Sequence, residues 1–212
     1  MNILKPQKIF INKIRKIENF IDELKINDCL ESVCIEDYTN ENVKLSNIKI
    51  EKAILNNVEV INGNLQDNTF IDIEFNNCNF SNTSFEKSCF IRCEFNNCKL
   101  TGCNFIESKM YNITFKETNS CYTNFSMASL ENILFDNTYL KNSYFQENRL
   151  KNIIFEQSDL SQTQFFKTSL KGIDFSNSNI EGIAVSLEDI RGAIINQFQA
   201  IDLMYLIGVK IK

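Results

Sequence analysis

The sequence of 212 residues contains no His and no Trp, and it has only one Pro and six Gly. Without His it lacks the commonest general base and a leading metal ligand, so no metal site is predicted. No run approaches the roughly 18 consecutive apolar residues of a membrane-spanning helix, and residues 1–16 lack the pattern of a secretory signal peptide. We therefore predict a cytoplasmic protein without membrane contact, whose eight Cys are reduced.

Catalytic chemistry is also sparse in this sequence. No candidate nucleophile has a candidate base nearby, and no Gly-rich loop could cradle a phosphate. The chain has 27 acidic and 22 basic residues and a net charge of −5, which does not favour direct binding of nucleic acid. These absences predict a protein that is not an enzyme, that needs no cofactor, and that acts through its surface.

Phe is abundant, with 18 copies, and its positions follow a repeat. Every fifth residue from Leu45 to Ile195 is large and apolar, with Ser120 as the exception. The residue two positions before each of these is usually small or β-branched, and the residues between are mostly polar. The exceptions at this second position are Asn68, Asn148 and Glu188. Two of every five side chains are therefore predicted to point inward.

A period of five fits neither an α-helix nor a long strand, whose side-chain periods are 3.6 and 2. It fits short extended segments, each followed by a turn, with the inward pair at alternate positions. Asn suits such turns and recurs two residues after the large apolar position, at Asn77, Asn82, Asn97, Asn132, Asn137, Asn142, Asn152 and Asn177. From Phe125 to Phe175 the large position alternates between Phe and Leu, which predicts a four-sided core with Phe facing Phe. Ser120 marks either a local kink or a tolerated polar replacement.

This pattern resembles the pentapeptide-repeat family, whose A(D/N)Lxx consensus is matched at Ala128-Ser129-Leu130 and Ser158-Asp159-Leu160. The resemblance implies an all-β solenoid, a right-handed quadrilateral β-helix in which four repeats, twenty residues, complete one coil. Coils would stack about 4.8 Å apart, the usual strand spacing. We predict an N-terminal cap or arm over residues 1–42, the β-helix over 43–195, and a C-terminal dimerisation helix and tail over 196–212.

Folding the sequence at twenty residues per coil gathers carboxylates on one wall. They flank the stacked Phe residues of that wall, and one basic residue, Lys116, lies among them. The predicted acidic, partner-binding face consists of Glu74, Glu94, Asp136, Glu156 and Asp174. The alternative interpretation is an ordinary solvated surface whose charge serves solubility.

Six of the eight Cys lie between Cys78 and Cys121. Cys78 and Cys98, twenty residues apart, are predicted to stack on one wall within reach of a disulfide. The simpler interpretation is that Cys serves here as a small buried apolar residue. A metal cluster is not predicted, because the sequence has neither His nor CxxC pairs.

The two ends differ from the repeat. Asn196 can cap a helix running to about Ile207, with Gly208 at its C′ position. One side of this helix can cover the last coil, and the other predicts a homodimer. The proposed dimer interface consists of Phe198, Ile201, Met204, Tyr205 and Ile207.

At the N-terminus, large apolar residues follow a helical spacing in a segment rich in poor helix formers. These residues are Phe10, Ile14, Ile17, Ile21 and Leu24. The segment is predicted to pack along the first coils, either as a helix or as an extended arm.

The C-terminal sequence is similar to the tail of the Qnr quinolone-resistance proteins across Ile194–Ala200, Leu203-Met204 and Leu206–Val209. Ser186–Ala193 and the ending Gly208–Lys212 also resemble the chromosomal Qnr-like proteins of Gram-positive bacteria. The resemblance implies a dimeric rod that binds DNA gyrase, topoisomerase IV or both, partly by mimicking DNA, and protects them from quinolones. The repeat register has no insertion between Leu45 and Ile195, so the projecting loops of some Qnr proteins are missing. The alternative is a solenoid scaffold whose partner is unrelated to DNA topology.

Overall fold

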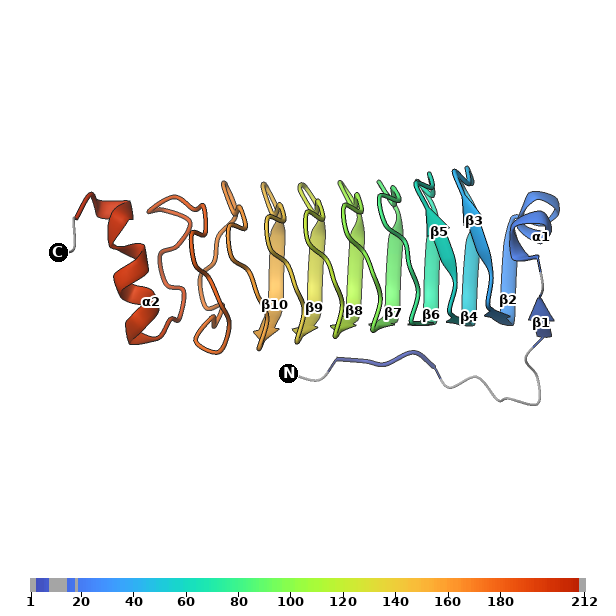
Figure 1. Ribbon diagram of the computed structural model, residues 1–212, viewed down its shortest axis with the longest axis horizontal. Coiled ribbons are helices and arrows are strands. Elements are labelled where there is room, and N and C mark those ends of the chain that lie inside the picture. Colours follow the sequence, from blue (N-terminus) through green and yellow to red (C-terminus); the bar gives the residue numbers. More distant parts are fainter. Residues whose placement is uncertain (1–2, 8–14, 18, 210–212) are drawn as a thin grey trace.

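Figure 1 shows the computed structural model, in which residues 3–7, 15–17 and 19–209 are described. The chain winds through parallel coils stacked along one axis, with α1 (Phe20–Ile26) near one end and α2 (Gln197–Asp202) at the other. The predicted solenoid of pentapeptide coils is confirmed. Within the ranges just given, every helix is too short or too polar to span a lipid bilayer.

The long strands form a parallel sheet in the order β1-β2-β4-β6-β7-β8-β9-β10, and β3 pairs separately with β5. Each strand from β6 to β10 turns a corner at its fourth residue, as at Asp72 and Arg92, so this sheet covers two adjacent walls of the solenoid. The strands are β1 Arg15–Ile17, β2 Cys29–Glu36, β3 Thr39–Glu41, β4 Lys49–Asn56, β5 Glu59–Ile61, β6 Thr69–Asn76, β7 Cys89–Asn96, β8 Lys109–Lys116, β9 Ser129–Asp136 and β10 Arg149–Glu156. Paired residues are twenty positions apart, as Phe75 and Phe95 are. The predicted length of one coil is therefore confirmed.

The corners of the coils use left-handed backbone. Among the Asn predicted to lie at turns, all except Asn177 have φ between 50 and 59°. Asn tolerates this region better than most residues, because its short polar side chain can hydrogen-bond locally. Other corners carry residues without that advantage, such as Tyr122 and Met127, at φ 60 and 58°. The stacked coils hold these residues in the same conformation because their neighbours above and below impose it.

The core is built from columns of Phe. Successive Phe of one column stack nearly parallel, with ring centroids 4.5 Å apart for Phe75–Phe95 and 5.4 Å for Phe155–Phe175. Across the core the rings meet edge to face, as Phe125 and Phe135 do at 6.1 Å. The predicted opposition of Phe to Phe is thus confirmed. Each fully buried Phe contributes about 1.5–3 kcal/mol through removal of apolar surface from water.

The small inward column also links the coils by hydrogen bonds. The Thr83 hydroxyl donates to the Val60 carbonyl at 2.6 Å and accepts the Gly63 N–H at 3.1 Å. Asn68, an exception in the sequence pattern, makes the same two links, to Leu45 and Ile48 in the preceding coil. The column also holds buried apolar residues such as Ile73 and Ala128, so these side-chain links are present in some coils and absent in others.

Ser120 causes no break in the stack. Its N–H donates to the Tyr139 carbonyl at 2.7 Å, and its carbonyl accepts the Ser143 hydroxyl at 2.8 Å. Its own hydroxyl lies 3.3 Å from that of Thr118. Of the two interpretations left open by the sequence, the tolerated polar replacement is correct, because the buried hydroxyl has a partner.

Coil geometry begins earlier than the sequence pattern indicated, inside the segment assigned to the N-terminal cap or arm. β2 already pairs in the twenty-residue register with β4. The pattern is hidden because Asn40 occupies a large apolar position, where its amide donates to the Tyr38 hydroxyl at 2.9 Å. Ahead of this coil, Ile17 lies in β1, and Ile21 and Leu24 are buried in α1. The predicted Phe10 and Ile14 lie outside the described residues.

The C-terminal helix begins as predicted. Asn196 caps α2 through bonds from the Phe198 and Gln199 N–H groups, and Gln199 completes a capping box. The helix then tightens to the 3-10 helix η2 (Leu203–Ile207) and ends at Gly208, whose φ is 72°. The buried amide of Gln199 donates to the carbonyls of Phe175 and Ser178 at 2.9 and 2.7 Å. It thereby satisfies backbone groups of the last coil that no further coil can reach.

Candidate partner-binding surface

The acidic face lies on the second half of the long strands, where alternate side chains point outward from the Phe column. Glu74 of β6 is paired in register with Glu94 of β7, and Asp136 of β9 with Glu156 of β10. Asp174 lies in the following coil, since Phe175 stacks on Phe155. The structure therefore places all five predicted carboxylates on one wall.

The carboxylates form two groups rather than one continuous ladder. Glu94 is followed in its column by Thr114 and then by Leu134, while Lys116 precedes Asp136 in the adjacent column. Dividing the sequence into coils of twenty residues correctly predicted that these carboxylates share one wall. The structure adds that Glu74 and Glu94 occupy one column and that Asp136 and Glu156 occupy the other.

The electrostatic environment differs between the groups. Burial raises the pKa of Glu74, the charge of Glu94 raises it further, and Lys5 acts in the opposite direction. In the exposed part of the face, hydrogen bonds from the Ser176 hydroxyl and N–H lower the pKa of Asp174. The Glu74–Glu94 pair thus concentrates negative charge at a partly buried site, whereas Asp174 is an exposed and well-solvated anion.

Residues 3–7, here called the strap, lie against this face. The Gln7 N–H donates to Asp72 Oδ1 at 3.0 Å, and the Leu4 N–H donates to Asn112 Oδ1 at 3.4 Å. Between them Lys5 Nζ lies 3.4 Å from Glu94 Oε1, and Pro6 is buried. Figure 1 shows this segment running back along the length of the rod, below the ends of the strands in this view. These contacts could not be predicted from the sequence, because they join residues 65 and 108 positions apart.

A groove of about 420 Å³ opens beside the strap. It separates the two carboxylate groups and combines apolar and charged walls. Its lining comes from the strap and from β7 to β10, through Ile3, Lys5, Glu94, Asn96, Thr114, Lys116, Leu134, Asp136 and Ile154. An extended segment with both apolar and cationic side chains fits such a lining, and the strap itself supplies one of each.

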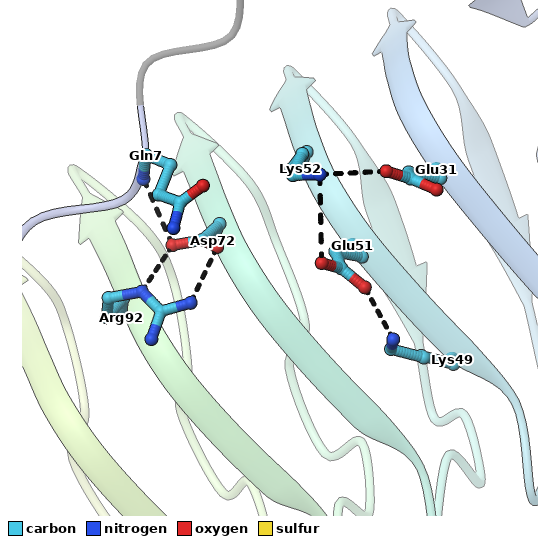
Figure 2. A network of polar contacts seen from close by, with 7 residues as sticks. All are labelled: Gln7, Glu31, Lys49, Glu51, Lys52, Asp72 and Arg92. Atoms are coloured by element: carbon cyan, nitrogen blue, oxygen red, sulfur yellow. Dashed lines mark hydrogen bonds and ion pairs between the residues drawn. The ribbon is translucent and has the colours of Figure 1, made fainter.

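Beneath the strap, Asp72 and Arg92 form a bidentate pair at a corner of the coils (Figure 2). Arg92 Nε and one terminal guanidinium nitrogen donate to the two carboxylate oxygens of Asp72 at 2.6 and 2.7 Å. Burial opposes ionisation of Asp72, but hydrogen bonds from Arg92 and the Gln7 N–H outweigh it and lower the pKa of Asp72. A nearby network joins Lys52 to Glu31 and Glu51 in the earlier coils.

The C-terminal end presents an apolar surface. Of the predicted interface residues, Phe198, Ile201, Tyr205 and Ile207 are exposed and Met204 is half-buried. Phe198, exposed over 69% of its surface, projects from the first turn of α2. Tyr205 is anchored, because its hydroxyl donates to the Ile183 carbonyl. Leu203 and Leu206 pack on the core instead, so the helix covers the last coil with one side and leaves the other apolar and open.

The cysteines are all free thiols, and those on the inward column are buried. Cys78 and Cys98 donate to the carbonyls of Leu55 and Phe75 at 3.4 and 3.3 Å. The pKa of Cys98 is raised by its hydrogen bond with Cys78 and by burial. Burial likewise raises the pKa of Cys93 to about 12. These thiols act as small, weakly hydrogen-bonding core residues, as the simpler interpretation predicted.

Comparison with known proteins supports the repeat assignment. The family description "Pentapeptide repeat region" matches residues 68–145 and 88–165. No curated protein sequence matches the chain.

Solved structures with a similar arrangement include QnrB1, a plasmid-mediated fluoroquinolone resistance protein. It is 19% identical over 87% of this chain and 90% of its own, with a TM-score of 0.40. HetL, a pentapeptide-repeat protein involved in heterocyst differentiation regulation in the cyanobacterium Nostoc, is 13% identical over 80% of this chain and 90% of its own, with a TM-score of 0.32. Rfr23, a pentapeptide-repeat protein from the cyanobacterium Cyanothece, is 9% identical over 83% and 97%, with a TM-score of 0.27.

Proposed function

Because this chain is a pentapeptide-repeat protein, we propose that it is a non-enzymatic, Qnr-like protein that binds DNA gyrase, topoisomerase IV or both. Binding occurs partly by mimicry of DNA and protects the topoisomerase from quinolones. The proposal rests on the similarity of the C-terminal sequence to the Qnr tail and on one structural observation. That observation is the alignment of carboxylates in register along one wall of a regular rod.

The spacing of these carboxylates explains how such a wall can meet a DNA-binding surface. Duplex DNA carries one negative charge per about 1.7 Å of axis, whereas successive coils lie about 4.8 Å apart. The acidic face is therefore a diluted anionic rod. Asp136, Glu156 and Asp174 form the part of it nearest the C-terminal end, and a basic cleft of a topoisomerase would pair with them at low ionic strength.

Supercoiling by purified gyrase in the presence of a fluoroquinolone tests the proposal. Added wild-type protein should restore supercoiling, and the double variant Asp136→Lys/Glu156→Lys should need at least about tenfold more protein, a loss of about 1.4 kcal/mol in binding. The matched control is Glu107→Lys/Glu181→Lys, which makes the same charge change at exposed residues away from the acidic face. Absence of rescue at every ratio, with gyrase and with topoisomerase IV in a decatenation assay, would reject the proposal.

We propose in addition that the apolar surface of α2 and η2 pairs two copies of the chain. The exposed Phe198, Ile201 and Ile207 support this, because large apolar groups gathered at one end of a rod favour association. Light scattering should give twice the chain mass for the wild type and the chain mass for Phe198→Glu/Ile201→Glu. Ile26→Glu, at the exposed end of α1, is the matched control and should leave the mass unchanged. A wild-type protein with the mass of one chain would refute the dimer.

A protein-interaction scaffold with a partner unrelated to DNA topology is the second candidate. The interruption of the acidic face by Leu134 and Thr114 favours it, because a continuous DNA mimic would carry charge at those positions. Titration of purified gyrase and of purified topoisomerase IV with the protein distinguishes the two candidates. Saturable binding that is lost in Asp136→Lys/Glu156→Lys supports the topoisomerase, and no binding at low ionic strength supports the scaffold.

A further inference from the structure

We infer that the acidic face contains a binding site for an extended cationic segment of a partner, and that the strap occupies this site as a built-in competitor. The partner segment would carry a lysine or arginine flanked by apolar residues. The claim that the strap limits topoisomerase binding rests on the proposed function. The claim that the acidic face contains this binding site does not depend on it.

The contacts of the strap resemble those of a bound peptide. Residues 3–7 belong to no strand, yet two of their backbone N–H groups donate to side chains of the coils, those of Asp72 and Asn112. The two acceptors lie in one corner column, forty residues and therefore two coils apart. The strap that bonds to both of them is thus an extended chain that runs along the rod axis. Backbone donors give affinity without regard to sequence, while side-chain positions along the segment give specificity.

Charge complementarity determines what the site accepts. Lys5 reaches Glu94, and its charge also opposes the rise in the pKa of the neighbouring Glu74. The cation therefore neutralises a pair of carboxylates that repel one another. A partner lysine or arginine at this place would make the same contact, and arginine would add bidentate geometry.

The apolar part of the site lies next to Ile3, two residues before Lys5 in the strap. Ile3 lines the groove together with the apolar Leu134 and Ile154 and the charged Asp136 and Lys116. An apolar side chain two residues before the cation thus has a place on the wall. The sequence Ile3-Leu4-Lys5-Pro6 is itself a ligand of the stated chemistry, with Pro6 buried against the coils.

The strap is weakly held, as a competitor must be. The ion pair joins a lysine side chain exposed over 81% of its surface to a glutamate exposed over 16%, and exposed pairs contribute little. The Leu4 N–H bond to the Asn112 amide is long and of modest net value, so the charge-assisted bond from the Gln7 N–H to the buried Asp72 carboxylate is the strongest contact of the strap. A partner that offers the same donors and a second cation can therefore displace it.

The test uses the full-length chain and a fluorescein-labelled synthetic peptide of residues 3–7. The variant Lys5→Glu/Gln7→Pro removes the cation and one backbone donor of the strap and leaves the face intact. Fluorescence anisotropy should show the variant binding the peptide at least about tenfold more tightly than the wild type does. Lys44→Glu, an exposed lysine away from the acidic face, is the charge-matched control and should behave as the wild type.

Two outcomes overturn the inference. One is equal affinity of the variant and the wild type for the peptide, or no binding by either. The other is binding by the variant that survives Glu74→Lys/Glu94→Lys, because the peptide would then be bound elsewhere. Unchanged circular dichroism and thermal unfolding of each variant exclude misfolding as the cause.

The gyrase rescue assay separates this inference from the proposed function. If both hold, the Lys5→Glu/Gln7→Pro variant should rescue supercoiling at about tenfold lower concentration than the wild type. If the variant binds the peptide tightly but neither protein rescues gyrase or topoisomerase IV, the proposed function is refuted and the binding site on the acidic face is retained. Rescue at the same concentration by both proteins refutes the role of the strap as a competitor.

Discussion

Interior coils and the two ends of the rod bury the same kind of core under different constraints. Phe105 stacks between Phe85 and Phe125 at 5.1 and 5.2 Å, so it has a copy of its own environment on each side. At the C-terminal end the last coil has such a neighbour on one side only, and Gln199 supplies the missing contacts. The interior is thus stabilised by repetition, whereas each end depends on a few individual residues.

The largest difference between the regions is expected in thiol reactivity. Burial raises the pKa of Cys93 to about 12, so at pH 8 its thiolate fraction is on the order of 1,000-fold below that of an ordinary thiol. Cys29, exposed in the first coil, should react with a maleimide reagent at the ordinary rate. Mass spectrometry of the native protein after limited labelling should find Cys29 modified and Cys93 intact. Equal labelling would show that interior coils open readily.

The same thiol predicts a loss of stability at alkaline pH. The pKa of Cys93 is raised in the folded protein, so the folded state keeps a proton that the unfolded state releases. Its contribution is complete below the ordinary thiol pKa of about 8.5 and is lost as pH rises toward about 12. Urea midpoints measured at pH 8 and pH 10 should fall with pH, and the fall should be smaller in Cys93→Ala.

Truncation of a large apolar side chain should lower the free energy of unfolding much more in an interior coil than at an exposed end of the rod. Phe105→Ala should lower the free energy of unfolding by about 3–5 kcal/mol, because the stacked neighbours prevent collapse of the cavity. Ile26→Ala, at the exposed end of α1, should change it by less than about 0.5 kcal/mol. Chemical denaturation followed by circular dichroism measures both. A small effect at Phe105 would contradict the rigid stack.

A smaller effect is expected where a single residue closes the last coil. Gln199→Ala removes two bonds to buried carbonyls and one half of the capping box, and should cost about 1–3 kcal/mol. Gln197→Ala, at an exposed position of the same helix, is the control. If the two variants unfold at the same urea concentration, the capping role of Gln199 is wrong.

The smallest effect is expected at the corners of the interior coils, where some residues are poorly suited to the left-handed backbone conformation. Met127 holds φ at 58°, which costs most residues about 1–2 kcal/mol and costs Asn less. Met127→Asn should therefore raise the free energy of unfolding by about 0.5–1 kcal/mol. Met127→Leu should leave it unchanged. Thermal unfolding of the three proteins gives the comparison.

Much of the acidic face could be predicted from the sequence, because a fixed twenty-residue coil assigns every outward residue to a wall. The strap could not. Its contacts join Gln7 to Asp72 and Leu4 to Asn112 through backbone donors, which any residue other than proline could supply. The first coil was also missed, since Asn40 interrupts the apolar series and is satisfied by Tyr38.

The sequence by itself determined the repeating unit, because one large apolar residue in five admits only short segments that turn at each corner. It also determined the C-terminal cap, since Asn196 and Gln199 act on their own neighbours. The tertiary structure alone decided which surface is free. Burial of Asp72, division of the carboxylates into two groups and closure of the strap over Glu94 arise between coils, where residues distant in the chain meet.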